Sequence, residues 1–169
     1  LGELPYELGG SYFLQTQHGL KEGKVPVVDL EAETKLQGLL IGGIELGLIS
    51  YAHDLAEGGL LVAMLEMLFG DLNLGAEIKR DTLESNARLD ALLFGESQGR
   101  ALIGVSPENL SSLLDLANQS GISAQVLGQT SENEVFSLKV DDEEILNSNV
   151  SKLRKIWEDT IPSMMQLSQ

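Results

Sequence analysis

The stretch ALIGVSPENLSSLLDLANQSGISAQVLGQTSENEVFSLKV, residues 101–140, decides the fold. Its apolar start at residues 101–105 predicts a buried strand. The Ser-Pro-Glu sequence at residues 106–108 predicts a helix start, because Ser favours the N-cap and Pro favours the first helical position. Leucines then recur at helical spacing as far as Gly121, which is expected to end this helix.

Two further strands are expected after that helix, at residues 124–127 and 135–140, with a polar turn at residues 130–133 between them. The order strand, helix, strand, strand is one half of an α+β plait. The acidic run that follows, at residues 141–144, is expected to form a solvated turn.

Helices are also expected on both sides of this stretch. The acidic residues after Asp29 favour a helix N-terminus, because the helix macrodipole stabilises negative charge there. Apolar residues then recur at helical spacing, namely Leu36, Leu39, Leu40, Ile44 and Leu48. The last helix is expected at residues 150–160, with Trp157 as an anchor in the core and Pro162 as its end.

The region between these helices predicts a mixture of elements. Residues 48–53 predict a short buried strand that leads to a turn at Asp54. Residues 60–69 are apolar on nearly every side and predict a buried helix. Residues 74–79 predict a strand, and residues 83–93 favour a helix or a loop.

The size and charge of the chain limit its functions. Its 169 residues, 43% of them hydrophobic, suffice for one folded domain, expected at residues 29–169 after an extended lead-in at residues 1–28. The net charge of −15 argues against nucleic acid and membrane surfaces as partners, since clustered Lys and Arg bind both. The lack of cysteine excludes disulfides, thiolate metal sites and a Cys nucleophile, and it permits a reducing compartment. The start at Leu1 instead of Met is interpreted either as an artificial boundary or as a cut inside a longer polypeptide.

The first candidate site is AHDLAEGG, residues 52–59. Gly58 and Gly59 at a strand-to-helix turn would let the backbone approach a ligand, and the next helix would direct its N–H groups at an anion. Asp54 and Glu57 could hold a cation such as Mg²⁺ that neutralises phosphates. The alternative is that the glycines make the turn while Asp54 or Glu57 caps the helix.

The second candidate site is LFGESQGR, residues 93–100. Glu96, Ser97 and Gln98 could hydrogen-bond a polar ligand, and Arg100 could form a forked pair with a phosphate or carboxylate. The alternative is a polar loop in which Glu96 and Arg100 pair locally and Ser97 caps a turn.

Hydrolase chemistry finds little support in the sequence. His53 and Asp54 could ligate a divalent ion, but the other histidine, His18, lies in the lead-in, so a multi-histidine site cannot form. No Gly-x-Ser-x-Gly elbow suggests a Ser-His-Asp hydrolase. We therefore assign no catalytic residue and no metal ligand set to this chain.

Three motifs together carry a resemblance to a known family. ELGGS at residues 7–11, HDLAEGGL at residues 53–60 and LFGESQGR at residues 93–100 resemble, in order and spacing, the last domain of phosphoribosylformylglycinamidine synthase, small type, of the AIR synthase-related superfamily. The tail KIWE at residues 155–158 is similar to the C-terminal end of that subunit. The resemblance implies an AIR synthase C-terminal-like, layered α/β (α+β) domain with a mixed sheet and partial ferredoxin-like topology.

The resemblance also implies an activity. The family converts formylglycinamide ribonucleotide, ATP and ammonia into formylglycinamidine ribonucleotide, ADP and phosphate in purine biosynthesis. The ammonia comes from glutamine through a partner glutaminase subunit, which agrees with the missing Cys nucleophile here, and Mg²⁺ offsets charge on the nucleotide. ATP and Mg²⁺ would thus belong to the parent enzyme, located in the cytoplasm, in which the upstream domains of the same subunit are the partners of this chain.

The family subunit is a tandem duplication, and this chain resembles the second copy of its α/β domain. The Glu-Ser-Gln at residues 96–98 is then the counterpart of substrate-binding residues in the first copy, and it is structural or lines an auxiliary nucleotide site. Ala56 and Glu57 stand where the family usually has Ser and Asp, and Tyr12 stands where a Glu commonly follows Gly-Gly-Ser.

Three interpretations follow. The leading one is a structural and auxiliary domain that is inactive alone. The second is a free-standing module that holds a nucleotide or phosphate with the Gly58-Gly59 turn and Arg100. The third is an interface domain, which predicts an exposed apolar patch and a homodimer when the domain is separated.

Overall fold

A computed structural model of the chain describes residues 1–4, 7–70, 74–79, 88–140 and 143–166. The chain forms two compact units. Unit 1 comprises Leu1–Ala63 and Ser85–Gln125, and unit 2 comprises Met64–Glu84 and Val126–Gln169. Each unit is described by itself.

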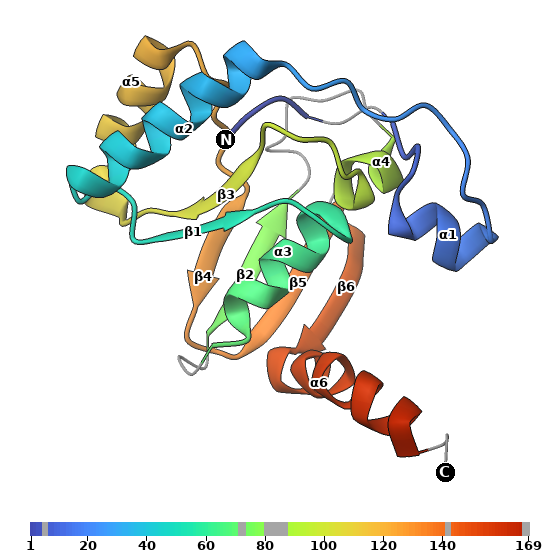
Figure 1. Cartoon of the computed structure of the whole chain (residues 1–169). Coiled ribbons are helices and arrows are strands. Elements are labelled where there is room, and N and C mark those ends of the chain that lie inside the picture. Colours follow the sequence, from blue (N-terminus) through green and yellow to red (C-terminus); the bar gives the residue numbers. More distant parts are fainter. Residues whose placement is uncertain (5–6, 71–73, 80–87, 141–142, 167–169) are drawn as a thin grey trace. The chain divides into compact units, whose positions relative to one another are not determined.

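Unit 1 contains five α-helical segments, one 3-10 turn and two strands in its described part (Figure 1). In chain order these are α1 (Tyr12–His18), α2 (Leu30–Glu45), β1 (Tyr51–Asp54), the first half of α3 (Gly59–Leu68), α4 (Leu89–Phe94), β3 (Ala101–Gly104), η2 (Pro107–Asn109) and α5 (Leu110–Ser120). The second half of α3 belongs to unit 2.

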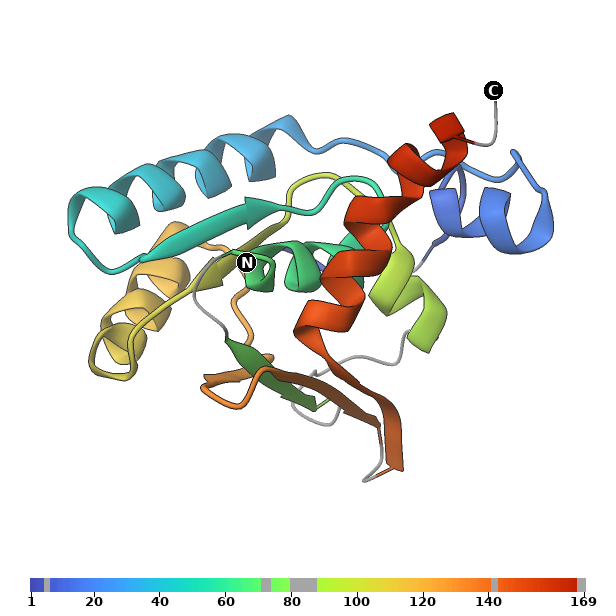
Figure 2. The same ribbon diagram turned by 90° about the horizontal axis from the view of Figure 1, so that it is seen from below.

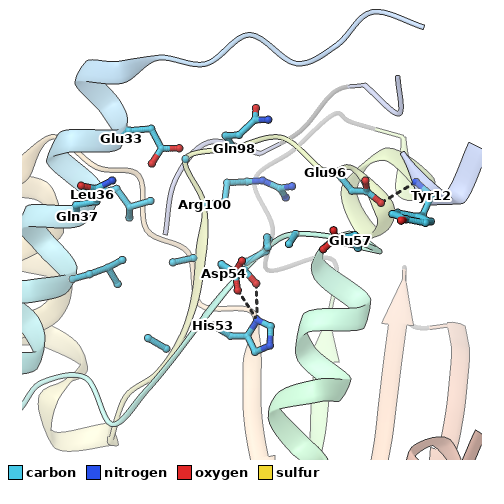
Figure 3. Close-up of a pocket in the computed structure, with 16 residues that line it drawn as sticks. Tyr12, Glu33, Leu36, Gln37, His53, Asp54, Glu57, Glu96, Gln98 and Arg100 are labelled. Atoms are coloured by element: carbon cyan, nitrogen blue, oxygen red, sulfur yellow. Dashed lines mark hydrogen bonds and ion pairs between the residues drawn. The ribbon is translucent and has the colours of Figure 1, made fainter. Parts of the chain in front are cut away.

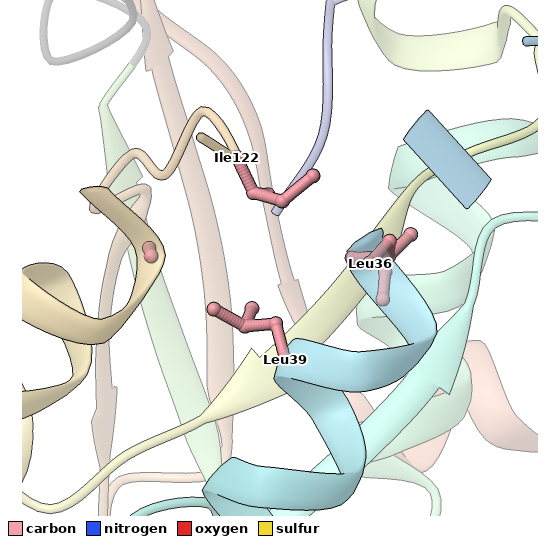
Figure 4. Close-up of a cluster of buried hydrophobic side chains, with 5 residues drawn as sticks. Leu36, Leu39 and Ile122 are labelled. Atoms are coloured by element: carbon pink, nitrogen blue, oxygen red, sulfur yellow. The ribbon is translucent and has the colours of Figure 1, made fainter. Parts of the chain in front are cut away.

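Helix α2 forms where the acidic pattern predicted it. The Asp29 side chain caps the helix by accepting hydrogen bonds from the N–H groups of Glu31 and Ala32, at 2.9 and 3.1 Å. Its buried stripe packs beside α5, and the two helices lie side by side in Figure 1. The buried core between them consists of Leu36, Leu39, Ala101, Ala117 and Ile122 (Figure 4).

Strands β1 and β3 form a two-stranded antiparallel sheet, with Tyr51 opposite Gly104 and Asp54 opposite Ala101. The predicted strand before Asp54 is thus confirmed in type. Its predicted burial is wrong, because Tyr51 is 54% exposed and His53 is the one residue of β1 that is partly covered. An edge strand has one open side, which an apolar sequence alone does not reveal.

Unit 2 is built on a four-stranded mixed sheet of order β4-β2-β5-β6. Its strands are β2 (Gly75–Lys79), β4 (Gly128–Ser131), β5 (Val135–Val140) and β6 (Glu143–Asn149). Strand β2 is parallel to β5 and antiparallel to β4, and β5 and β6 are antiparallel. After β6 the chain continues directly into α6 (Val150–Gln166), the long helix seen in Figure 2.

The two faces of this sheet differ because side chains alternate along a strand. Ala76 and Ile78 of β2 lie opposite Phe136 and Leu138 of β5, and all four are buried. The other face carries Glu77, whose carboxylate accepts a hydrogen bond from Lys139 Nζ at 3.0 Å. One face is therefore core, and the other is held by polar contacts.

The expected mixed sheet and α/β class are confirmed, and the order strand, helix, strand, strand recurs as β3, α5, β4 and β5. The plait half is not formed as one sheet in the described residues, because β3 pairs with β1 while β4 and β5 flank β2. Helix α3 and strand β2 also lie close to their predicted ranges. In the region 83–93, which was predicted as a helix or a loop, residues 83–87 lie outside the described residues. Its last residues belong to helix α4.

Several predicted boundaries are wrong. No strand forms at residues 124–127. Strand β4 lies instead at Gly128–Ser131 and overlaps the first two residues of the predicted turn, because its backbone pairs with β2. Of the predicted acidic turn, residues 141–142 lie outside the described part, whereas Glu143 and Glu144 begin strand β6. Pro162 lies inside α6 and does not end it. Trp157 is 55% exposed and contacts Phe69, with 5.8 Å between ring centroids, so it is not a core anchor.

Two further differences concern helix starts. The lead-in predicted as extended contains helix α1, capped by Ser11, whose Oγ accepts a hydrogen bond from Leu14 N–H at 3.4 Å. Ser106 was predicted to cap a helix, but a 3-10 turn intervenes and its buried Oγ has no hydrogen-bond partner. The domain boundary at residue 29 stays a prediction. Within the described residues, every helix is too short or too polar to cross a membrane.

Candidate functional site

Unit 1 contains a cavity of about 590 Å³ that brings together both candidate motifs (Figure 3). Its walls come from the start of α1, from α2, from the end of β1 and the turn after it, and from the loop before β3. The polar lining residues are Tyr12, Glu33, Gln37, His53, Asp54, Glu57, Glu96, Gln98 and Arg100.

Arg100 is buried beside this cavity, with 7% of its surface exposed. Its Nε donates to the Ser97 carbonyl at 3.1 Å, and its Nη2 donates to the Gly95 carbonyl at 2.6 Å. These two bonds fold the loop at residues 95–100 around the guanidinium. Burial lowers the pKa of Arg100 to about 10, because desolvation disfavours the charged form.

Glu96 holds two other segments of the chain to this loop. Its Oε1 accepts a hydrogen bond from the Tyr12 N–H at 2.9 Å, at the start of α1, and another from the Gly58 N–H at 2.9 Å. Figure 3 shows the Glu96 carboxylate directed at Tyr12. A carboxylate that accepts two main-chain N–H bonds acts as a clamp between segments far apart in sequence.

The glycines of the first motif are required by the backbone. Gly58 and Gly59 have φ values of +82° and +67°, in the left-handed region that glycine tolerates. A Cβ on Gly59 would lie 2.7 Å from the Gly95 carbonyl oxygen and 2.8 Å from the Phe94 carbonyl carbon. The turn therefore packs tightly against the second motif, which supports the interpretation that the glycines shape the turn.

His53 and Asp54 form a local contact at the end of β1. The ring Nδ1 of His53 lies 2.6 Å from the Asp54 carbonyl oxygen and 3.5 Å from Asp54 Oδ1. Asp54 and Glu57 line the same cavity, but the described residues hold no group of three or more His, Cys, Asp or Glu that could bind a metal ion. We assign no magnesium step to these side chains.

The structure brings five of the eight candidate residues to one cavity, namely Asp54, Glu57, Glu96, Gln98 and Arg100. The other three, Gly58, Gly59 and Ser97, do not line it and shape its walls through their backbones. The predicted alternative for the second motif was a local pair of Glu96 and Arg100. Each instead bonds main-chain atoms. A ligand-binding role for the eight residues stays a prediction.

Sequence reasoning missed the opposite wall of the cavity. Glu33 and Gln37 line it from α2, one helical turn apart. The available signal was their spacing, since polar residues four apart lie on one face of a helix. Nothing in the sequence indicated which other element that face would meet.

The charges of the cavity are unequal. Glu33, Asp54, Glu57 and Glu96 contribute four carboxylates, whereas Arg100 contributes one guanidinium. Within the described part of the chain, both hydrogen bonds of that guanidinium end on carbonyl oxygens, and no carboxylate there bonds it. An anionic group could thus be accepted at Arg100, while the surrounding carboxylates oppose a large anion.

Comparison with known proteins gives a consistent result. The profile of the family described as AIR synthase related protein, C-terminal domain, matches residues 3–141. The chain is 40% identical over 165 residues to "Phosphoribosylformylglycinamidine synthase subunit PurL" of Moorella thermoacetica, a match that covers 98% of this chain. It covers 22% of that protein, so the chain spans about a fifth of the length of this curated relative.

Solved structures of Thermotoga maritima proteins share the fold. PurL complexed with FGAR matches with a TM-score of 0.76 and 27% identity, over 90% of this chain and 27% of that one. Phosphoribosylformylglycinamidine synthase II matches with a TM-score of 0.70 and 25% identity, over 89% of this chain and 25% of that one. The resemblance found from the motifs is thereby confirmed.

Proposed function

Because this chain belongs to the AIR synthase related protein family, as its C-terminal domain, we propose that it serves as the last domain of a phosphoribosylformylglycinamidine synthase-type ligase. The parent enzyme would convert formylglycinamide ribonucleotide, ATP and ammonia into formylglycinamidine ribonucleotide, ADP and phosphate. In that reaction the amide oxygen is phosphorylated, and ammonia then displaces the phosphate. The 40% identity over nearly the whole chain is the main support.

The chain itself acts as a structural and auxiliary domain and is inactive alone. The observation that carries this is that two charged side chains of the second motif already form hydrogen bonds with the main chain. Glu96 accepts two main-chain N–H groups, and Arg100 donates to two main-chain carbonyls. Groups already bonded in this way hold the domain together and are poorly available for a substrate.

The rest of the synthase supplies the chemistry. The upstream domains of the same subunit bind ATP with Mg²⁺, and a partner glutaminase subunit delivers ammonia. The reaction takes place in the cytoplasm. The net charge of −15 supports this division, because a domain so acidic repels the phosphates of ATP and of the ribonucleotide substrate.

A domain exchange tests the proposal. The matched 165-residue segment of the Moorella thermoacetica protein is replaced by this chain, and product formation from formylglycinamide ribonucleotide, ATP and ammonium chloride is measured. We expect activity from the exchanged protein, none from a protein lacking the segment, and none from this chain alone. Turnover by the chain alone would overturn the inactive role, and a folded but inactive exchanged protein would overturn the equivalence of the domains.

A second candidate function is a module that binds a nucleotide or phosphate. The specific support is Arg100, a buried cation beside the cavity whose lowered pKa reflects burial alone. Calorimetric titration with ATP, ADP and inorganic phosphate, each with and without Mg²⁺, distinguishes this role. Binding at millimolar ligand that Arg88→Met leaves intact and Arg100→Met abolishes would favour it, whereas the absence of heat at these concentrations would contradict it.

An interface role is the third candidate. Helix α6 exposes Ile156, Trp157, Ile161, Met164 and Met165, each at 55–70% of its surface. Such a run of exposed apolar side chains is typical of a surface that is covered by another protein part. Sedimentation equilibrium tests whether the separate chain forms a homodimer, and a monomer at all concentrations would contradict self-association.

A further inference from the structure

The segment at residues 8–24 closes on itself, and we call it the strap. At its base, the Gly10 N–H donates to the Glu22 carbonyl at 3.3 Å. Gly9 and Gly23 pack backbone to backbone there, since a Cβ on Gly23 would lie 2.7 Å from the Gly9 Cα. The strap is therefore a loop with joined ends, of the kind that moves as one body.

Helix α1 inside the strap depends on docking for its existence. It has seven residues, none of them buried. A helix of this length is not stable alone in water, because nucleation fixes several residues for few hydrogen bonds. The Gly19 cap and the Leu20 N–H bond to the Leu14 carbonyl, at 3.1 Å, close its C-terminal end but do not attach it to the rest of unit 1.

Two contacts attach the strap to the end of α4 and the loop that follows it. Phe13 stacks on Phe94 with 4.5 Å between ring centroids and an interplanar angle of 15°. The Tyr12 N–H donates to Glu96 Oε1 at 2.9 Å. Both partners lie within three consecutive positions of the chain, so the strap is docked at one place.

The packing around this attachment is incomplete. A hollow of about 210 Å³ lies between α1 and the start of α4, with Phe13, Leu14 and His18 on one side and Arg88 and Ala91 on the other. This hollow is open to solvent, since His18 and Arg88 beside it are exposed, so α1 and α4 do not fill the space between them with packed side chains. Among the described residues, one ring stack and one hydrogen bond join α1 to the rest of unit 1. A short helix with so few attachments belongs to the low-stability part of a structure.

We propose that the strap opens from unit 1 and closes onto it as one body, and that Glu96 is the latch. Tyr12 and Glu96 both line the large cavity, so opening the strap widens the cavity at that end. Glu96 also keeps the Gly58 N–H bonded at 2.9 Å, so the latch remains in position when the strap has left. The strap is thereby a lid that closes again onto Glu96, whose position the Gly58 N–H maintains.

Hydrogen exchange on a matched pair of variants tests the latch. Tyr12 is the first helical residue after the Ser11 cap, where proline fits a helix without strain. Tyr12→Pro removes the N–H that Glu96 accepts, whereas Tyr12→Ala removes the side chain and keeps that N–H. We expect the amides of residues 14–20 to exchange about tenfold faster in Tyr12→Pro than in Tyr12→Ala. The reason is that only Tyr12→Pro loses the hydrogen bond to the charged Glu96 carboxylate.

Helix α5 serves as the internal reference, because it lies in the same unit as the strap and its Leu113 and Ala117 are buried. Its exchange should be equal in both variants. Equal exchange of residues 14–20 in the two variants would overturn the latch. If these amides in the unaltered chain exchanged at the rate of the buried amides of α5, the strap would leave only when unit 1 unfolds, and this would overturn separate opening.

A second pair of variants separates the latch from general loss of stability. Glu96→Gln keeps an oxygen that accepts both N–H groups, and it should leave the strap nearly as protected as before. Glu96→Ala should speed exchange both in α1 and at Gly58, whereas Tyr12→Pro should act on α1 alone. Failure of Glu96→Gln to retain the protection that Glu96→Ala loses would contradict the role of the Oε1 contact.

Discussion

Arg100 carries a positive charge into unit 1, and its guanidinium donates hydrogen bonds to the backbone carbonyls of Ser97 and Gly95. The charge of this residue thus organises a loop, while the same residue type on a surface would pair with a carboxylate, as Arg88 does with Asp90. A buried carbonyl that loses its donor is costly, because it has left water without a replacement partner. The loop at residues 95–100 should therefore be sensitive at Arg100.

Arg100→Met keeps an unbranched apolar stem and removes both bonds to carbonyls. We expect it to lower the free energy of unfolding by about 2–4 kcal/mol, because the carbonyl oxygens of Ser97 and Gly95 lose their hydrogen-bond donor. Urea denaturation followed by circular dichroism measures this. The control is Arg88→Met, whose side chain is 81% exposed and which should change stability by less than about 0.5 kcal/mol. Equal effects of the two substitutions would contradict the role of Arg100 in holding the loop at residues 95–100.

Glu77 in unit 2 gives a dependence on pH. Hydrogen bonding and charge attraction from Lys139, together with charge attraction from Lys79, hold the pKa of Glu77 below its ordinary 4.5. A lowered carboxyl pKa adds stability that is present above the ordinary value and is lost as the pH falls through the folded-state value.

The urea midpoint of the unaltered chain should therefore exceed that of Glu77→Gln at pH 6, and the difference should shrink steadily below pH 4.5. Glu132→Gln, an exposed position on the turn before β5, is the control. If the difference between the two urea midpoints grew as the pH fell, the lowered pKa of Glu77 would be contradicted.

Elements with strong local signals could be predicted from the sequence. Helix α2 follows from an Asp cap and an apolar stripe, and β2 and β5 follow from alternating apolar and polar residues. Strand β4 could not, since its sequence Gly-Gln-Thr-Ser is that of a turn and pairing with β2 alone makes it a strand. Helix α1 was missed for a similar reason, because its docking on Phe94 and Glu96 joins residues about eighty positions apart.

The candidate site was predictable to the extent that its residues lie in contiguous motifs. The turn at Gly58 and the loop at residues 95–100 were identified, and they meet at Glu96. The wall formed by Glu33 and Gln37 was not, because it depends on how α2 packs, and packing is a property of the whole unit. The sequence also could not show that Glu96 accepts hydrogen bonds from main-chain N–H groups while Arg100 donates to main-chain carbonyls, because these contacts depend on the folded structure.

Pro162 is the exception within α6, since the proline lacks the N–H that would bond one turn earlier. We expect Pro162→Ala to restore that bond and to increase helical ellipticity at 222 nm. Thermal melts should show a higher midpoint, because alanine has a higher helix propensity than any other residue. Ser163→Ala, at the neighbouring exposed position, should give a smaller gain, and an equal gain would show that the missing N–H is unimportant.

At the scale of the molecule, the net charge of −15 acts on every element at once. Repulsion among like charges disfavours the folded state, and salt screens it over about 10 Å at 0.1 M. We expect the urea midpoint to rise as sodium chloride increases from about 10 to about 300 mM, since the Debye length falls over this range.

The matched variant carries Asp115→Lys and Glu132→Lys, two exposed positions in different units. Each exchange removes a negative charge and adds a positive one. The variant should be more stable than the unaltered chain at low salt and should respond less to added salt. The same salt response in both proteins would indicate that the general charge repulsion is not the cause.

Trp157, which contacts Phe69, has a consequence for spectroscopy. It is the chain's single tryptophan and lies in unit 2, whereas Tyr12 and Tyr51 lie in unit 1. Indole emission excited at long wavelength therefore reports on one unit, and phenol absorbance contributed by the tyrosines reports on the other. The protein carries its own pair of optical probes, and coincident or separate transitions of the two signals reveal whether the units unfold together.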